Sequence, residues 1–394
     1  MFFVGLIRLY WQMRRHGSWS PVRGRVRTPS PIWIQIGHAL VSSAQNNAVR
    51  FQKVNIDAFA HALPDRVVTS ESLEERLAPL YEKLRLRSGR FELMTGIRER
   101  RHWEPGTRPS TVAAQAGELA LAKAGLPRDQ IGCLIHASVC RDFMEPATAS
   151  VVHRRLELRD DCEVFDLSNA CLGVANAMVL AAEKIELGRV DHALVVAGED
   201  GGPLVEQTIE SLLAMENAGK AELKTAFASL TIGSGAAAVV LSRVNENQPS
   251  SHRLLGGIVR SATQHNELCQ GDRAGNNTGP LMHTDAEALM LAGNELARET
   301  WAKFRDEFDF ETTPIDRYVT HQVGVRHRQL LLETLGMDPE RDFPTVETLG
   351  NIGSVSLPLG FSMAEEAGFI QSGQRVAMFG IGSGLHCLML AIDW

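Results

Sequence analysis

The segment Phe165-Asp166-Leu167-Ser168-Asn169-Ala170-Cys171-Leu172-Gly173 gives the strongest indication of how this chain folds. It predicts a short strand over 163–167, a turn, and a helix of small residues over 171–187 that ends at Gly188. A cysteine at the start of a helix faces unpaired amides and the positive end of the helix dipole, which stabilise a thiolate. Such a position can lower a cysteine pKa by about one unit or more. The same local sequence also fits a buried structural cysteine.

From Arg50 onward, apolar strand patterns alternate with amphipathic helical patterns, which predicts a layered α/β fold. Strands are expected at 131–139, 163–167, 192–197, 231–242, 317–320 and 375–379, and helices at 111–124, 148–156, 171–187, 285–304, 326–335 and 354–366. The last segment, 380–394, repeats the glycine-rich turn and apolar strand of 231–242, which suggests an internal duplication, although any α/β chain can produce such echoes. The polar segment Asn245–Ser251 predicts a linker between two halves, 49–244 and 252–394.

The composition excludes several classes of protein. A net charge of -7 gives no indication of a nucleic-acid-binding surface, and 6% aromatic residues disfavour base-stacking platforms. The six cysteines form no CxxC pair, and no histidines stand at the spacing of zinc ligands. These features predict a reduced, cytoplasmic protein without a metal site.

The first 48 residues carry six arginines and no Asp or Glu. A secretory signal peptide is disfavoured because the apolar run precedes most of the basic residues, and no stretch of about 20 apolar residues predicts a membrane span. A transit-like or membrane-surface segment stays open. Our hypothesis is that residues 1–48 are a basic extension that is disordered or, with a start near Val49, not translated. The mass of the native protein would test it.

Two other segments could contribute to a site. Tyr318-Val319-Thr320-His321-Gln322 places a histidine at the carboxyl end of a short strand, where α/β sheets bind ligands. Gly350-Asn351-Ile352-Gly353-Ser354 predicts a tight turn before a helix, in which Asn351 could be a turn residue or an N-cap. Taken singly, each residue favours a structural role.

Taken together, Cys171, His321 and Asn351 resemble the Cys-His-Asn triad of the β-ketoacyl synthase III branch of the thiolase superfamily. The resemblance extends from about Arg50 to Trp394. Five segments carry it in the family's order: TGIRERR (Thr95–Arg101), DLSNACLG (Asp166–Gly173), TIGSGAAAVVL (Thr231–Leu241), HQVGVRH (His321–His327) and GNIGSVSLP (Gly350–Pro358). It implies a thiolase-like, five-layered αβαβα fold of two pseudo-symmetric halves, and a homodimer.

Within that branch the sequence is most similar to the OleA enzymes, which condense two long-chain acyl-CoA molecules at the start of olefin synthesis. The segment Ser138–Ser150 resembles the OleA loop whose glutamate reaches into the partner subunit's site, a role that would fall to Glu145. The end motif Gly380–Leu385 also resembles OleA and implies an oxyanion hole formed by the amides of Cys171 and Ser383. His386 departs from the pattern, which has Asn there, and the CoA-contacting residues stay unassigned because the family's Trp/Arg pair finds no match.

The resemblance implies a non-decarboxylative Claisen condensation. Cys171 takes the acyl group of one acyl-CoA, Glu145 removes a proton from the α-carbon of the second, and His321 and Asn351 hold the enolate oxygen. The product is a β-keto acid. CoA thioesters are substrates, no cofactor or metal is implied, and later enzymes of the olefin pathway are candidate partners. The segment Leu204–Phe227 is expected to line acyl channels, or else to be an ordinary surface helical hairpin.

Three alternatives remain at this point. A decarboxylating 3-oxoacyl-ACP synthase III would join malonyl-ACP to an acyl-CoA in fatty acid synthesis, and it obtains its carbanion without a carboxylate base. Glu145 argues against that enzyme unless it is only a solvated loop residue. A relative of hydroxymethylglutaryl-CoA synthase is disfavoured because its motifs differ. A catalytically silent thiolase-fold lipid-binding or scaffold protein is disfavoured by the presence of Cys171, His321 and Asn351 together.

Overall fold

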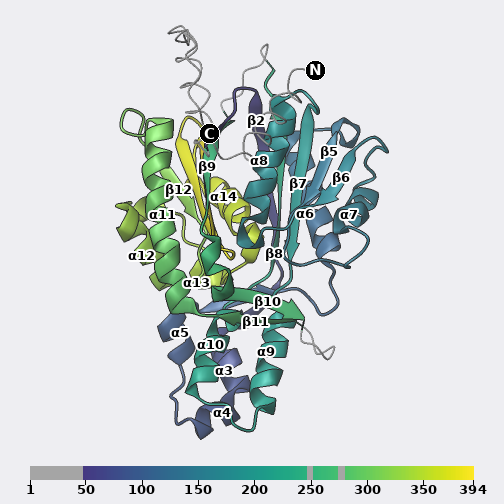
Figure 1. Cartoon of the computed structure of the whole chain (residues 1–394). Coiled ribbons are helices and arrows are strands. Elements are labelled where there is room, and N and C mark those ends of the chain that lie inside the picture. The colour runs from purple at the N-terminus through teal and green to yellow at the C-terminus, as the bar shows by residue number, and fades with distance from the viewer. Residues whose placement is uncertain (1–47, 246–251, 274–279) are drawn as a thin grey trace, which may run out of the picture. The chain divides into compact units, whose positions relative to one another are not determined.

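The computed structural model has one mixed sheet, in the strand order β12-β13-β14-β9-β2-β8-β7-β5-β6, with β1 paired to β9 (Figure 1). The structure describes residues 48–245, 252–273 and 280–394. Its sheet strands are β1 (Ala48–Arg50), β2 (Val54–Ala62), β5 (Cys133–His136), β6 (Glu163–Asp166), β7 (His192–Glu199), β8 (Gly235–Arg243), β9 (Arg253–Ser261), β12 (Arg317–Thr320), β13 (Arg375–Gly382) and β14 (His386–Asp393). Residues 1–47 and 246–251 lie outside the described residues, so the predicted extension and linker stay predictions.

The two parts of the sheet repeat the same pairing pattern. In the first part, β2 with β8 and β8 with β7 are antiparallel, and β7 with β5 is parallel. In the second part, β9 with β14 and β14 with β13 are antiparallel, and β13 with β12 is parallel. Between β2 and β9 the two parts meet at one register pair, Asn55 and Arg253. The pattern is the repetition expected of two pseudo-symmetric halves.

Helices cover the outer face of each part and fill the space between the parts. The outer helices are α6 (Pro109–Ala124) and α7 (Thr148–Leu156) on the first part, and α11 (Ala286–Phe308) and α12 (Val325–Leu335) on the second. The central helices, α8 (Gly173–Glu186) and α14 (Ser356–Glu366), contact strands of both parts. This arrangement confirms the predicted layered α/β fold of the thiolase type.

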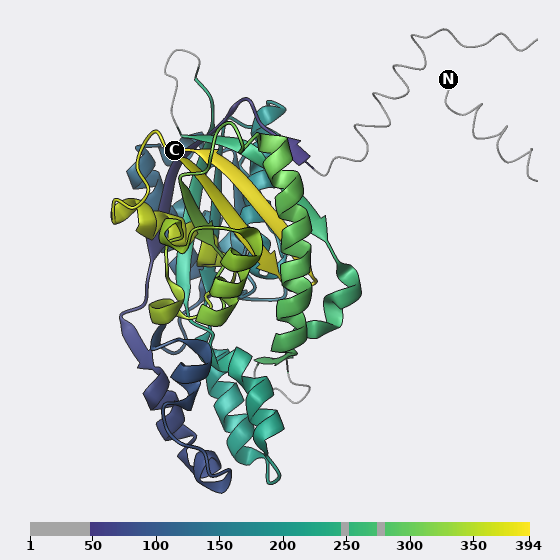
Figure 2. The same ribbon diagram turned by 90° about the vertical axis from the view of Figure 1, so that its left-hand side faces the viewer.

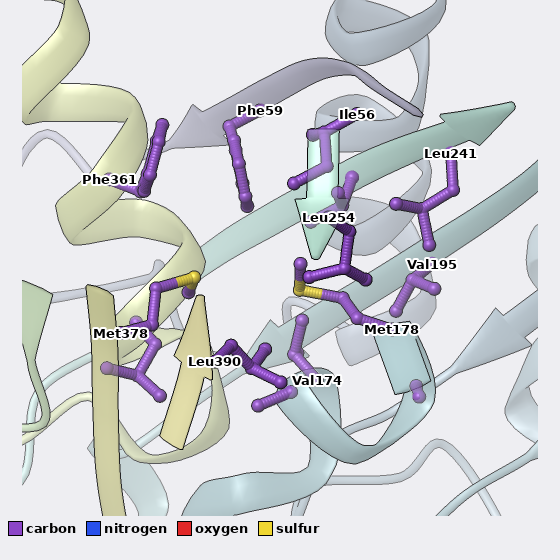
Figure 3. Packing of buried hydrophobic residues seen from close by; sticks show 14 of the residues in the cluster. Ile56, Phe59, Val174, Met178, Val195, Leu241, Leu254, Phe361, Met378 and Leu390 are labelled. Atoms are coloured by element: carbon purple, nitrogen blue, oxygen red, sulfur yellow. The ribbon is translucent and has the colours of Figure 1, made fainter. Parts of the chain in front are cut away.

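The central layer is held by apolar packing. Figure 3 shows Met178 of α8 and Phe361 of α14 among side chains from both parts of the sheet, including Val195 of β7 and Leu390 of β14. All four side chains are fully buried. Because burying one such side chain stabilises a fold by about 1.5–3 kcal/mol, this shared core joins the two halves strongly.

A helical cap lies at one end of the sheet in both views (Figures 1 and 2). It contains α3 (Ser70–Arg76), α4 (Ala78–Lys83), α5 (Arg90–Thr95), α9 (Gly202–Ala214) and α10 (Lys220–Leu230), with the ribbons β3–β4 (Arg66–Thr69, Glu99–His102) and β10–β11 (Cys269–Arg273, Pro280–Thr284). Phe227 of α10 packs edge-on against Phe91 of α5, with ring centroids 5.3 Å apart. The segment Leu204–Phe227 is thus a half-buried helical pair, and its role in lining acyl channels stays a prediction.

Candidate active site

Cys171 lies on a 3-10 turn, η2 (Ala170–Leu172), between β6 and α8. The expectation that Cys171 itself opens the α-helix is wrong, because α8 begins at Gly173. Leu172 has a φ of -97° and a ψ of 2°, which are not α-helical, and Ala170 before Cys171 adopts a left-handed φ of 44° that non-glycine residues rarely take. The side-chain amide of Asn169 donates to Asn176 Oδ1 at 2.7 Å and fixes the turn to α8.

Two glycines allow other elements to approach this turn closely. A Cβ atom on Gly173 would lie 2.9 Å from Ala137 O and 3.5 Å from Ser354 Cβ. A Cβ atom on Gly382 of β13 would lie 3.6 Å from Cys171 N. The backbone of Cys171 is therefore packed between the end of β13 and the start of α14.

Asn351 occupies the turn before the second central helix. A 3-10 turn, η5 (Gly353–Val355), precedes α14, and it packs against η2 as the half-to-half symmetry requires. The Asn351 N–H donates to Thr231 O at 2.9 Å, and the Gly353 N–H donates to Asn351 Oδ1 at 3.0 Å. The bond from Gly353 holds the side-chain oxygen of Asn351. The side-chain NH2 is the group that can donate to a substrate.

His321 directly follows β12, and its N–H donates to Phe379 O at 2.8 Å. This bond places His321 beside Gly380, which abuts Leu172 of the nucleophile turn. The side chain is only 9% exposed, and neither ring nitrogen has a hydrogen-bond partner among the described residues. Since buried polar groups are normally paired, two such nitrogens indicate a place that a substrate oxygen or a transferred proton would occupy.

The electrostatics of the site correct one expectation. Burial raises the pKa of the Cys171 thiol to about 12, and the nearby acidic groups Cys269 and Glu199 add to the effect. The predicted lowering of this pKa is therefore wrong, even though Cys171 keeps part of its surface open. Burial, together with His327, lowers the pKa of His321 to about 4. The Cys171 thiol and the His321 imidazole are therefore both neutral at neutral pH. The thiol has to lose its proton when the sulfur attacks a substrate.

Glu145 stands on an exposed loop tip, next to Met144, which is 86% exposed. The base of the loop is fixed: the N–H groups of Val139 and Cys140 donate to Glu199, and Asp142 accepts from the N–H of Ser110 at 2.9 Å. The tip thus projects from an anchored base into space where another subunit could receive it. The role of Glu145 stays a prediction.

Ser383 lies in the turn between β13 and β14, directly after the glycine that touches the Cys171 amide. This position is compatible with its predicted place in an oxyanion hole, which stays a prediction. His386 begins β14, and its Nδ1 shares a hydrogen bond of 2.9 Å with Ser261 Oγ. The imidazole is therefore held at the same turn.

Glu199, at the end of β7, is a residue that the sequence analysis missed. It is 4% exposed and lies close enough to Cys171 to raise the pKa of the thiol. The sequence did contain a signal for Glu199, which is an acidic residue just after the strand predicted at 192–197. The carboxyl ends of parallel strands gather at one edge of a sheet, so an acidic residue there is expected near the site.

A second missed group holds the end of β12. The Thr320 N–H and hydroxyl donate to the buried carboxylate of Asp342, and the Gln322 Nε2 donates to Phe343 O. Arg328 forms an ion pair with the same carboxylate. Burial raises the pKa of Asp342 to about 6 against the lowering effect of Arg328. The neighbours of His321 on both sides are thus fixed to one buried network.

In the described residues, no helix is both long and apolar enough to cross a bilayer, and no group of three or more His, Cys, Asp or Glu residues has the arrangement of a metal site.

Known proteins with similar sequences belong to one group of condensing enzymes. Residues 165–255 match the model of 3-oxoacyl-[acyl-carrier-protein] synthase III, and residues 306–394 match the model of its C-terminal part. An acyl-CoA:acyl-CoA alkyltransferase of Shewanella oneidensis is 40% identical over 88% of this chain and 100% of its own length. A β-ketoacyl-[acyl-carrier-protein] synthase III of Symbiobacterium thermophilum is 29% identical over 88% of this chain and 99% of its own.

Solved structures of the same group of enzymes are similar to this chain. A cysteine-to-serine variant of Xanthomonas campestris OleA, with bound lauric acid and lauroyl-CoA, superposes with a TM-score of 0.82 at 37% identity. The match covers 87% of this chain and 100% of that one.

Proposed function

This chain belongs to the OleA family of acyl-CoA:acyl-CoA alkyltransferases, within the 3-oxoacyl-[acyl-carrier-protein] synthase III group, and from that membership we propose that it joins two long-chain acyl-CoA molecules head to head. The reaction is a Claisen condensation without decarboxylation. It proceeds through an acyl-cysteine and ends, after hydrolysis of the last thioester, in a β-keto acid.

The first half-reaction acylates Cys171. Its sulfur attacks the carbonyl carbon of one acyl-CoA, the thiol proton passes to the neutral His321, and CoA leaves as a thiol when it takes up that proton. The amides of Cys171 and Ser383 hold the oxyanion of the tetrahedral intermediate. Burial lowers the pKa of His321 to about 4, so its imidazole is unprotonated at neutral pH, and the proton transfer has to be coupled to the attack of the sulfur.

The second half-reaction forms the carbon–carbon bond. Glu145 of the neighbouring subunit removes a proton from the α-carbon of a second acyl-CoA, while His321 and the Asn351 NH2 donate to the thioester oxygen, which carries the enolate charge. The α-carbon attacks the acyl-cysteine carbonyl. The sulfur of Cys171 leaves and is protonated again, and a β-keto thioester remains for hydrolysis.

One observation supports this proposal most directly. The imidazole of His321 has no hydrogen-bond partner among the described residues, and the segments that carry His321 and Asn351 both pack next to the turn of Cys171: η5 contacts η2, and Gly380, beside His321, abuts Leu172. Acylation requires a nucleophile and a proton acceptor, and enolate formation requires two donors for one oxygen.

Incubation of the purified protein with myristoyl-CoA alone tests the function. We expect CoA release together with a β-keto product, seen by mass spectrometry without any malonyl donor. Cys171→Ala should abolish acyl transfer, and Glu145→Ala should leave a stable acyl-Cys171 that never condenses. Product formation only with malonyl-ACP would instead identify the decarboxylating synthase, and failure of Cys171 to react with an acyl-CoA would favour a silent scaffold protein.

The proposal extends to the surroundings of the enzyme. We expect a cytoplasmic homodimer in which each subunit lends Glu145 to the other. An enzyme that consumes a β-keto acid, such as a later member of an olefin pathway, is the expected next partner.

A further inference from the structure

We infer that Glu199 is a positioning residue that fixes the loop of the catalytic carboxylate and the turn of Asn351 in one geometry around Cys171. This inference rests on the proposed function. Glu199 lies at the carboxyl end of β7, and its carboxylate accepts hydrogen bonds from two separate segments.

The first contact is with the Glu145 loop. The Val139 N–H donates to one carboxylate oxygen of Glu199 at 2.9 Å, and the Cys140 N–H donates to the other at 3.1 Å. These are the residues at which the chain leaves the end of β5 and enters the loop. The direction in which the loop departs is therefore set by the two oxygens of Glu199.

The second contact is with the Asn351 turn. The N–H of Ser354 donates to Glu199 Oε1 at 3.3 Å, and its hydroxyl donates to the same oxygen. Ser354 belongs to η5, directly after Gly353, whose N–H holds the side chain of Asn351. The buried carboxylate of Glu199 thus connects the loop that carries Glu145, the proposed catalytic base, with the turn that carries Asn351.

Glu199 is not itself suited to be the base. It accepts four hydrogen bonds and is 4% exposed, so its oxygens already have their partners and substrate has little access to them. Its negative charge also disfavours the Cys171 thiolate. Because its charge destabilises the thiolate of the proposed nucleophile, we assign Glu199 a role through the groups that it holds in place.

Glu199→Gln is the informative variant because it keeps the side-chain volume. An amide has one accepting oxygen, so its NH2 must face either the loop amide of Cys140 or the contacts with Val139 and Ser354, and one set of bonds is lost whichever way it turns. Misplacement of a catalytic group by about 1 Å can cost a hundredfold in rate.

Both half-reactions should be measured with myristoyl-CoA, with acylation of Cys171 followed by intact mass and condensation by product formation. We expect Glu199→Gln to retain acylation within about threefold while condensation falls at least about tenfold. Asp200→Asn is the matched control, because that neighbouring carboxylate contacts Gly202 and Ser234 instead of the loop, and the ratio of the two rates should stay at the wild-type value.

A second readout shows whether the surroundings of Cys171 stay folded in the variant. Of the groups that act on the Cys171 thiol, Glu199 and Cys269, only Glu199 loses its charge in the variant. The pH profile of iodoacetamide alkylation at Cys171 should therefore shift to lower pH in Glu199→Gln. If the variant does not fold, Ser354→Ala, which removes one donor and keeps the carboxylate, should lower condensation more than acylation.

The inference fails if acylation and condensation fall together in Glu199→Gln, or if condensation is unchanged. Failure of the proposed function looks different, because the wild-type protein itself would then form no β-keto product from acyl-CoA alone.

Discussion

His321 and Cys171 are both uncharged at neutral pH. Burial opposes the charge on both groups, since it lowers the pKa of the imidazole to about 4 and raises that of the thiol to about 12. The sulfur therefore becomes nucleophilic only while its proton moves. A thiol with so high a pKa reacts slowly with electrophiles at neutral pH.

The raised pKa of Cys171 predicts the pH dependence of its alkylation. The fraction of thiolate should rise about tenfold for each pH unit between pH 7 and 10, because this whole range lies below the pKa of the thiol. No inflection between pH 5 and 7 is expected from His321, whose pKa lies lower. The rate of iodoacetamide addition, followed by peptide mass with Cys171→Ala as the blank, measures it. A plateau below pH 9 would show an ordinary or activated thiolate.

The sequence located these residues but could not give their ionisation. Cys171, His321 and Asn351 were found through their motifs and order. The pKa of Cys171 depends on burial and on Glu199 and Cys269, which belong to β7 and β10 and are distant in the chain. A local rule for helix starts therefore gave the wrong sign.

At the scale of elements, predicted boundaries were accurate where local pattern decides them. The helix at 148–156 and the strand at 317–320 have the predicted limits. The strand predicted at 231–242 begins only at Gly235, because the Gly233 N–H donates to Asn351 O instead of to a neighbouring strand of the sheet. Such a tertiary contact leaves no trace in the hydrophobic pattern.

The network that fixes β12 gives a prediction about stability. Asp342→Ala removes the acceptor of Thr320 and leaves the half-buried Arg328 guanidinium without its carboxylate, which should lower the free energy of unfolding by about 3–5 kcal/mol. Adding Arg328→Met should recover part of the loss, because the unpaired charge is then gone. Urea unfolding measures both variants.

The control for this prediction is an exposed pair. Arg298→Ala breaks the surface contact with Glu295 and should leave the urea midpoint unchanged. If Asp342→Ala unfolds at the same urea concentration as the wild type, the network does not support β12, and the position of His321 needs another explanation.

At the scale of the whole molecule, the exposed position of Glu145 predicts complementation between subunits. Cys171→Ala and Glu145→Ala homodimers should each be inactive in condensation. In mixed dimers formed by co-expression, one site has Cys171 from one chain and Glu145 from the other. Random pairing makes half of the dimers mixed, each with one intact site, so about a quarter of wild-type activity should return.

The control is a mixture of the two purified variants under conditions without subunit exchange, which should stay inactive. Absence of activity in verified mixed dimers would place Glu145 in the site of its own chain, or outside catalysis.

The layered fold and its duplication could be anticipated from alternating patterns and repeated strand endings. What the sequence could not provide is how the halves meet, because that depends on packing between side chains far apart in the chain. The cap also escaped prediction, except for its α9–α10 pair, since its short helices carry no long periodic pattern.

Between β2 and β9, the halves share one register pair, Asn55 with Arg253, while Met178 and Phe361 lie in a common apolar layer. Three register pairs of β1 with β9, and the bond from the Asn351 N–H to Thr231 O, also join the halves, so backbone bonds and the apolar layer act together. The approach of η5 to the turn of Cys171 is then expected to depend on the volumes of side chains in this layer. A change of side-chain volume deep in that layer should therefore alter the activity of the enzyme without altering any of its proposed site residues.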